Sequence, residues 1–323
     1  MYDAAMKRIL LFLAALVISL PLAAQESWPS RPVRFIVPSS PGGGTDLYAR
    51  ILAQALGEAL GQQFVVENRP GASGNIGAAA AASSAPDGYT FLVSANPALT
   101  VNPSLYRNLP YNAERDFAPV TRGVMGPMVI VAHPSLPAKS LAELVALGRR
   151  EPRALAFGSA GTGSPTYLGV RMLEENTGAR FLHLAYKGLG PAYQDLLGGQ
   201  IKFMFADVAS AISHVRGGKL RALAVTQSTP LLPGMPTLAQ AGYPLDVWSS
   251  FSVVAPMGTP APIVQRLSTE IGRAMRSPAV ADKLSGQALI PVFDTPEEFA
   301  AALRAERARW AEFIRRNGIE SSE

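Results

Sequence analysis

The chain of 323 residues contains no cysteine, and this absence excludes several kinds of chemistry. Thiol catalysis, thiolate zinc sites and iron–sulfur clusters all require cysteine. At about 100–200 residues per domain, the length predicts two domains, each able to bury a core without disulfides or metals. Glycine and proline, with 29 and 27 residues, stay below the ~25–30% of the chain that is typical of low-complexity disorder. The composition therefore indicates a folded globular protein.

Clusters of positive charge are also lacking, although the formal net charge is +5. Arginines are frequent between Arg304 and Arg316, but Glu306 and Glu312 lie among them. Nucleic-acid binding depends on clustered lysine and arginine that neutralise phosphates. We therefore expect no nucleic-acid partner, and we interpret this stretch as a solvated helix face.

Signatures of common enzyme classes are absent as well. A dinucleotide-binding fingerprint requires a small residue where the first glycine-rich loop has Leu47, and a P-loop requires Ser or Thr where Leu220 stands. Neither Ser159 nor Ser164 fits the Gly-x-Ser-x-Gly motif of serine hydrolases. The three histidines form no metal-binding motif, and they lie at His133, His183 and His214. We expect no enzymatic activity, no cofactor and no metal site.

One hydrophobic run stands out near the N-terminus, and no later run in the sequence reaches the length of a membrane span. Lys7 and Arg8 precede an uncharged, mostly apolar run at 9–20, and small residues end this segment at Ala24. The run is shorter than the ~20 apolar residues that a spanning helix needs. A basic start, a short apolar run and small residues are typical of a cleaved secretory signal. We expect residues 1–24 to be removed on export, which places the mature protein outside the cytoplasm.

Beyond residue 32, short β-rich runs alternate with helical patterns, as is typical of βαβ units with largely parallel sheets. Strands are predicted at 33–37, 64–67, 89–93, 154–157, 181–185, 203–205 and 220–225. Helices are predicted at 46–60, 75–83, 140–150, 164–178, 263–275, 279–284 and 296–316. The third of these helices begins with Ser140 and Glu143, which have the spacing of a capping box. The sequence therefore predicts an α/β fold in which helices flank mostly parallel sheets.

Two further β-rich segments, at 120–132 and 247–255, contain or follow glycines and prolines. We interpret both as crossings between two domains. The C-terminal helices would then return to the first domain. We expect domain 1 to be discontinuous, with residues 25–126 and 248–323, and domain 2 to comprise residues 127–247.

Three loops that follow predicted strands are candidate ligand sites, because open α/β sheets bind ligands beyond the carboxyl ends of their strands. The first loop, residues 38–46, and the second, residues 158–164, are rich in glycine and hydroxyl groups, and each leads into a helix. The third is Ala206-Asp207. Glycine lets the backbone approach a ligand closely, and free N–H groups at a helix start favour an anion. The two glycine-rich loops, one in each expected domain, predict a small carboxylate held mainly by neutral donors.

Several of these residues also have a purely structural interpretation. Thr45 and Ser164 could act only as helix caps. Asp46 could meet a cationic group of a ligand, but an aspartate in the first turn also stabilises its own helix terminus. Lys187 could contact a ligand or remain in a solvated loop. Because Asp46 already has a local task, we expect Asp207 to be the aspartate that faces the ligand.

Short motifs follow one another in order over nearly all of the mature chain. They include Pro41-Gly42-Gly43-Gly44-Thr45-Asp46, Pro86-Asp87-Gly88-Tyr89-Thr90 and Gly158-Ser159-Ala160-Gly161-Thr162-Gly163-Ser164, with others at 28–34, 67–77, 102–106, 186–188, 195–200 and 218–225. Each motif alone is weakly specific. Together they resemble the substrate-binding receptors of tripartite tricarboxylate transporters, the Bug or TctC type.

The resemblance implies a periplasmic binding protein of the two-domain, type II-like fold. Its cleft between the domains would close on a small carboxylate, which could be a dicarboxylate, a tricarboxylate, a keto acid or an acidic amino acid. The receptor, which we expect to be a monomer, would then deliver this ligand to the membrane permease subunits of the transporter.

The resemblance also implies which residues bind the ligand. In this family the loops that match 41–46 and 158–164 hold the carboxylate through backbone N–H groups, hydroxyls and bound water. Two positions depart from the family, which often has Phe at Ser39 and His at Tyr167, and both would face or border the pocket. The candidate ligand-binding residues are Ser39, Ser40, Gly43, Gly44, Asp46, Ser94, Asn96, Ser159, Thr162, Gly163, Ser164, Tyr167 and Asp207.

Two other functions are alternatives to a transport receptor. A ligand sensor would present its loaded form to a membrane signalling partner instead of a permease. An exported hydrolase would use a serine of the second loop as its nucleophile, but no motif places a histidine and an acid beside that serine.

Overall fold

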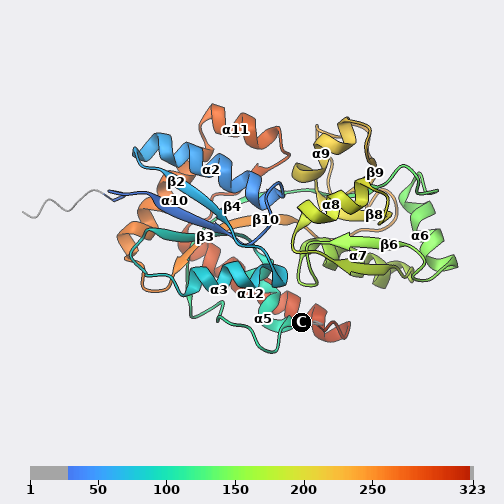
Figure 1. The fold of residues 1–323 in the computed structure, drawn as a ribbon, viewed down its shortest axis with the longest axis horizontal. Helices are drawn as coiled ribbons and strands as arrows, with labels where there is room; N and C mark the ends of the chain where they lie inside the picture. Colours follow the sequence, from blue (N-terminus) through green and yellow to red (C-terminus); the bar gives the residue numbers. More distant parts are fainter. Residues whose placement is uncertain (1–27, 321–323) are drawn as a thin grey trace, which may run out of the picture.

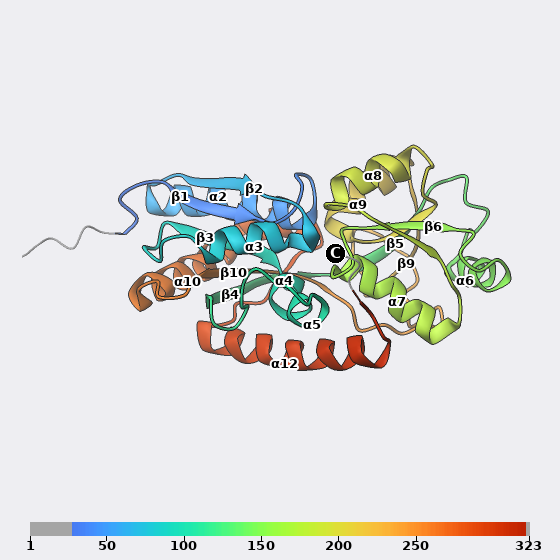
Figure 2. The same cartoon turned by 60° about the horizontal axis from the view of Figure 1, so that its bottom comes forward.

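The structure, a computed structural model, describes residues 28–320, which form two α/β domains that lie side by side (Figure 1). The predicted secretory signal at 1–24 lies outside the described residues. Helix α12, Pro296–Arg316, runs along the first domain and reaches the second (Figure 2). Within residues 28–320, no helix combines the length and the apolar character needed to cross a bilayer.

The first domain is built on a six-stranded sheet with the order β11-β4-β10-β3-β1-β2. Its strands are β1 Val33–Val37, β2 Phe64–Asn68, β3 Thr90–Ala95, β4 Phe117–Gly126, β10 Ser249–Pro256 and β11 Ile290–Pro291. Its main helices are α2 Gly44–Leu60, α3 Asn75–Ala82, α10 Ala261–Met275, α11 Pro278–Ser285 and α12. Because side chains of a strand alternate between faces, Phe35 packs with α2, α10 and α11, whereas Ile36 packs with α3 and α12. Helices therefore cover both faces of this sheet.

The second domain is built on a five-stranded sheet with the order β7-β6-β8-β5-β9. Its strands are β5 Met128–Ala132, β6 Ala156–Ser159, β7 Leu182–Ala185, β8 Phe203–Asp207 and β9 Arg221–Val225. Phe205 of β8 packs in one core layer with α6, Leu141–Arg150, and α7, Pro165–Thr177. Met204 packs in the opposite layer with α8, Leu189–Leu197, and α9, Val208–Arg216.

Each sheet is mixed rather than mostly parallel, which corrects one part of the predicted fold. In the described part of the chain, four of the nine strand pairings are parallel, and the five antiparallel ones all involve β4, β5 or β10. These strands carry the chain between the sheets, since β4 ends at Gly126, β5 begins at Met128 and β10 begins at Ser249. A strand that arrives from the other sheet is not joined to its neighbour by a crossover helix, so nothing requires it to run parallel. The two-domain α/β class itself is confirmed.

Most predicted strands and helices are present, with ends that differ by a few residues. Within residues 28–320, four short helices are not evident from the sequence, namely α4 Pro97–Thr100, α5 Asn102–Leu105, α8 and α9. Helix α8 contains Gly190-Pro191, a pair that normally indicates a loop. Ser140 caps α6 by accepting a hydrogen bond from the N–H of Glu143 at 3.2 Å. The Glu143 carboxylate instead binds the N–H of Lys139 at 2.7 Å, so the predicted capping box is incomplete.

Candidate functional site

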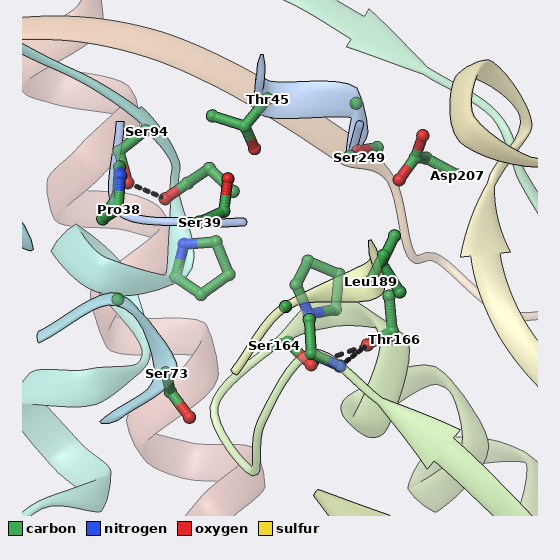
Figure 3. Close-up of a pocket in the computed structure, with 18 of the residues that line it drawn as sticks. Pro38, Ser39, Thr45, Ser73, Ser94, Ser164, Thr166, Leu189, Asp207 and Ser249 are labelled. Carbon is green, nitrogen blue, oxygen red and sulfur yellow. Dashed lines mark hydrogen bonds between the residues drawn. The ribbon is translucent and has the colours of Figure 1, made fainter. Parts of the chain in front are cut away.

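A cleft lies between the two domains, where loops that follow strands of both sheets meet (Figure 3). Its volume, measured as the space open to the centre of a water molecule, is about 90 Å³. The space is thus larger than a site for a single bound water, which occupies about 10–15 Å³. The cleft therefore suits a small metabolite.

Part of the predicted set of site residues lines this cleft. These residues are Ser39, Gly43, Gly44, Ser94, Ser164 and Asp207. The other predicted residues lie outside the lining, and they are Ser40, Asp46, Asn96, Ser159, Thr162, Gly163 and Tyr167. The lining also contains polar residues that were not in the predicted set, namely Thr45, Ser73, Thr166, Lys187 and Ser249.

Several helices begin at the cleft, and four of them are α2, α7, α8 and α9, each of which follows a strand whose carboxyl end lies there. Two of them are capped by side chains. Ser164 Oγ accepts a hydrogen bond from the N–H of Tyr167 at 3.3 Å, and Asp207 Oδ1 accepts one from the N–H of Ser210 at 2.8 Å. Helices α2 and α8 begin after a glycine and have no side-chain cap. Their first N–H groups carry the partial positive charge of a helix start, which favours an anion in the cleft.

Charged side chains are scarce in the lining of the cleft. Lys187 is exposed, whereas Asp207 is only 5% exposed. Burial raises the pKa of Asp207, and hydrogen bonds from Ser210 offset only part of this effect. No arginine lies among the lining residues. A carboxylate bound here would therefore be held by N–H groups and hydroxyls.

Asp46 lies in the first turn of α2 and is engaged by its own surroundings. Its carboxylate accepts hydrogen bonds from the N–H of Gly42 and from Arg50 Nε, both at 3.0 Å, and from Asn68 Nδ2 at 2.9 Å. Burial raises the pKa of Asp46, but these hydrogen bonds and the charge of Arg50 outweigh burial and lower it. The contacts of Asp46 thus match its local structural interpretation.

Ser159 lies behind the second loop and pairs with a histidine that no sequence motif indicates. Ser159 is fully buried, and its Oγ forms a hydrogen bond with Nε2 of His183 at 2.7 Å. The same oxygen accepts a hydrogen bond from the N–H of Gly161 at 3.1 Å. The His183 ring stacks on Phe157, with ring centres 5.0 Å apart. Ser159 and His183 therefore fix the shape of the second loop from behind.

This serine and histidine pair does not form a catalytic triad. A serine nucleophile must be reachable by its substrate, and its histidine must be oriented by a third group. Ser159 has no exposed surface, and within residues 28–320 no carboxylate is hydrogen-bonded to His183. Ser159 therefore does not fit the role of the nucleophile in the hydrolase alternative.

Three other predicted residues make contacts outside the cleft lining. Ser40 Oγ donates a hydrogen bond to the Lys187 carbonyl of the second domain at 3.2 Å. Asn96 Nδ2 donates to the half-buried Glu306 carboxylate at 3.3 Å. Tyr167 packs its ring beside Phe157 in the core of the second domain. These residues support the walls of the cleft.

Glycines line the seam where the two domains touch across the cleft. A Cβ atom on Gly44 of the first domain would lie 2.5 Å from Asp207 Oδ1 of the second. A Cβ atom on Gly163 of the second domain would overlap Asn102 Oδ1 of the first. Gly188 approaches the first loop in a similar way. A side chain at any of these positions would hold the domains apart.

Gly43→Val tests whether the first loop contacts the ligand. The backbone of Gly43 has φ −80° and ψ 165°, which valine adopts readily, and the nearest atom to an added Cβ is Ser40 O at 3.8 Å. The variant should therefore melt at the wild-type temperature. Its branched side chain should occupy the cleft and weaken carboxylate binding, measured by calorimetric titration, by about tenfold or more.

Ser164→Ala is the comparison for this variant. It removes a helix cap, which costs about 1 kcal/mol of stability, and it should weaken binding less than Gly43→Val does. If Gly43→Val folds and binds like the wild type, the first loop is not part of the site.

Gly163→Ala tests whether binding requires the domains to touch. Gly163 has no left-handed backbone, so alanine adds no backbone strain, and the added methyl group meets Asn102 only where the domains meet. Overpacking costs about 1–3 kcal/mol, so the affinity should fall by about 5- to 150-fold while the melting temperature of the unliganded protein stays unchanged. Gly57→Ala, where an added Cβ makes only an ordinary contact at 3.5 Å, is the matched control. Equal affinities for the two variants would contradict a role for the seam.

His183 should make the stability of the protein depend on pH. Burial, together with the positive charge of Arg171, lowers the pKa of His183 to about 4, whereas in the unfolded chain it is about 6.5. The stability from the neutral ring is therefore complete above pH ~6.5 and is lost as the pH falls toward 4. Urea unfolding at pH 7.5, 6 and 5 measures the free energy of unfolding. As the pH falls, this free energy should decrease less for His183→Gln than for the wild type. If the free energy of unfolding falls equally with pH in the two proteins, His183 does not titrate in this way.

Comparison with known proteins gives a consistent result over most of the chain. The sequence profile of the tripartite tricarboxylate transporter family receptor matches residues 48–319. Protein BugT of Bordetella pertussis is 40% identical over 96% of this chain and 96% of its own. A UPF0065 protein of Pseudomonas sp. strain P51 is 35% identical over 90% of this chain and 87% of its own.

Solved structures agree with this relationship. An adipate complex of an R. palustris protein superimposes with a TM-score of 0.88 at 35% identity, and it covers 91% of this chain and 99% of its own. The periplasmic binding protein BugD superimposes with a TM-score of 0.87 at 33% identity, over 91% of this chain and 100% of its own. MatC of Rhodopseudomonas palustris with bound malate superimposes with a TM-score of 0.84 at 30% identity, over 89% of this chain and 100% of its own. The chain belongs to the tripartite tricarboxylate transporter receptor family.

Proposed function

We propose that this protein is a periplasmic receptor that captures a small carboxylate in the cleft and delivers it to the membrane permease of a tripartite transporter. The observation that carries the proposal is the uncapped start of α2, which meets the uncapped start of α8 at a cleft without arginine. Similar proteins have adipate and malate bound in their structures, which supports the same class of ligand here.

Neutral donors are sufficient for useful affinity. A hydrogen bond to a charged group contributes about 1.5–3 kcal/mol, so four or five of them offset the cost of ordering the ligand and still leave micromolar binding, about −8 kcal/mol. The hydroxyls of Thr45 and Ser73 lie in the lining beside the helix starts. They can provide donors in addition to the backbone N–H groups.

The rest of the predicted organisation fits this role. We take residues 25–126 with 248–323 and residues 127–247 as two bodies that move about their connections, since the chain changes sheets after Gly126 and before Ser249. Closure on the ligand would form the seam contacts described above. The same proposal has three further parts. The N-terminal signal directs export, the receptor is a monomer, and the permease subunits recognise its loaded form.

A thermal-shift screen of residues 25–323 tests the proposed function. The panel contains mono-, di- and tricarboxylates, keto acids, acidic amino acids and neutral sugars. A carboxylate at about 100 times its dissociation constant should add about 2.7 kcal/mol to the free energy of unfolding. Gly43→Val should show no stabilisation by the same compound, because its cleft is filled. Stabilisation by a neutral sugar, with none by any carboxylate, would refute the proposal.

A further inference from the structure

Asp207 is the one carboxylate among the residues that line the cleft. It ends strand β8 and is the N-cap of α9, where Oδ1 accepts the hydrogen bond from the N–H of Ser210 at 2.8 Å. Within residues 28–320, no hydrogen bond reaches its second oxygen, Oδ2. A side chain that is only 5% exposed therefore has one acceptor oxygen left for a molecule in the cleft.

The carboxylate of Asp207 lies directly against the start of α2. A Cβ atom on Gly44, the first residue of α2, would lie 2.5 Å from Oδ1 and 2.9 Å from Cγ of Asp207. Figure 3 shows Asp207 facing the cavity from the second domain, with Thr45 of α2 across from it. A ligand carboxylate held by the first N–H groups of α2 would therefore have Asp207 as a neighbour.

This arrangement places opposite requirements on two parts of one ligand. The α2 start favours a negative group, whereas Asp207 repels a second carboxylate beside it, strongly so where water is scarce. The exposed Lys187 is the one other charged residue of the lining. The group of the ligand that approaches Asp207 must therefore be neutral or positive, and it must donate a hydrogen bond to leave no buried acceptor unsatisfied.

We propose that Asp207 selects carboxylates that carry a hydroxyl or an ammonium group on the carbon next to the carboxylate. The ligand carboxylate binds the start of α2, and its neighbouring donor binds Oδ2 of Asp207. The selected class is thus the 2-hydroxy and 2-amino carboxylates, in preference to plain dicarboxylates of the same length. This inference rests on the proposed function, because it assigns a specificity residue to the same cleft.

Asp207→Asn is the informative variant. Asparagine is as good an N-cap as aspartate, so the N–H of Ser210 keeps its acceptor and the fold is retained. The negative charge opposite the ligand donor is removed. Asp46→Asn is the matched control, because it removes the same charge from a carboxylate that pairs with Arg50 and lies outside the lining.

The experiment measures dissociation constants by calorimetry for two sets of ligands of equal chain length. One set is succinate, malate and aspartate, and the other is glutarate, 2-hydroxyglutarate and glutamate. The wild type should prefer the hydroxy or amino member over the plain diacid of a set by about 10- to 100-fold, the range expected for a hydrogen bond to a charged group. Asp207→Asn should reduce this ratio by about tenfold or more. Asp46→Asn should change the affinity for the plain diacid and the affinity for its hydroxy or amino analogue by the same factor, so that the ratio stays the same.

Each remaining outcome overturns the inference in a recognisable way. If the wild type binds the three members of each set equally, or if Asp207→Asn keeps the wild-type ratio, Asp207 does not select the ligand, while the carboxylate receptor stands. If Asp207→Asn weakens all members alike, Asp207 acts on the ligand carboxylate itself and the assignment is wrong. If no carboxylate binds the wild type, the proposed function fails together with the inference.

Discussion

The uncapped start of helix α2 is the feature on which the rest of the site depends. Its first N–H groups are free because the N-cap residue is Gly43, which has no side chain to bind them. A serine or aspartate there would satisfy the donors that an anionic ligand needs. Ser164 and Asp207 do this at α7 and α9. Helices α7 and α9 thus have starts that the protein itself closes, whereas α2 and α8 have starts that are open to a ligand.

An open helix start binds an anion strongly only when water is kept away from it. The seam between the domains, where they touch across the cleft, can exclude this water. The second domain approaches α2 so closely that Gly44 has no room for a Cβ atom. On the opposite side of the cleft, Ser73 has a left-handed backbone, φ 51°, and its Oγ accepts a hydrogen bond from the N–H of Gly163 at 3.4 Å. Away from the cleft, Trp310 of α12 packs in one apolar cluster with Leu168 of α7. If the domains separate, α12 must therefore either stay packed against α7 or leave this cluster exposed to water.

The sequence predicts the parts of the site that are encoded locally and misses those that depend on long-range contacts. The loop at 38–46 and Asp207 are recognisable because each lies at the carboxyl end of a predicted strand. The pairing of Ser159 with His183 arises because β6 and β7 lie side by side, with Phe157 opposite His183, and no local spacing indicates this register. The contribution of Ser73 is hidden for the same reason, since its partner at the seam belongs to the other domain. The antiparallel pairing of β4, β5 and β10 likewise depends on contacts between distant parts of the chain.

Asp46 and Asp207 show how tertiary surroundings give one residue type two roles. Each lies at the start of a helix that begins at the cleft, and burial raises the pKa of both. At Asp46, Arg50 and Asn68 surround the carboxylate, and their hydrogen bonds lower its pKa overall. At Asp207, no cation is hydrogen-bonded to the carboxylate in the described chain, and the pKa remains raised. In the described chain Oδ2 of Asp207 accepts no hydrogen bond, and Asp207 lies in the wall of the cleft, so a ligand with a donor group can bind this oxygen.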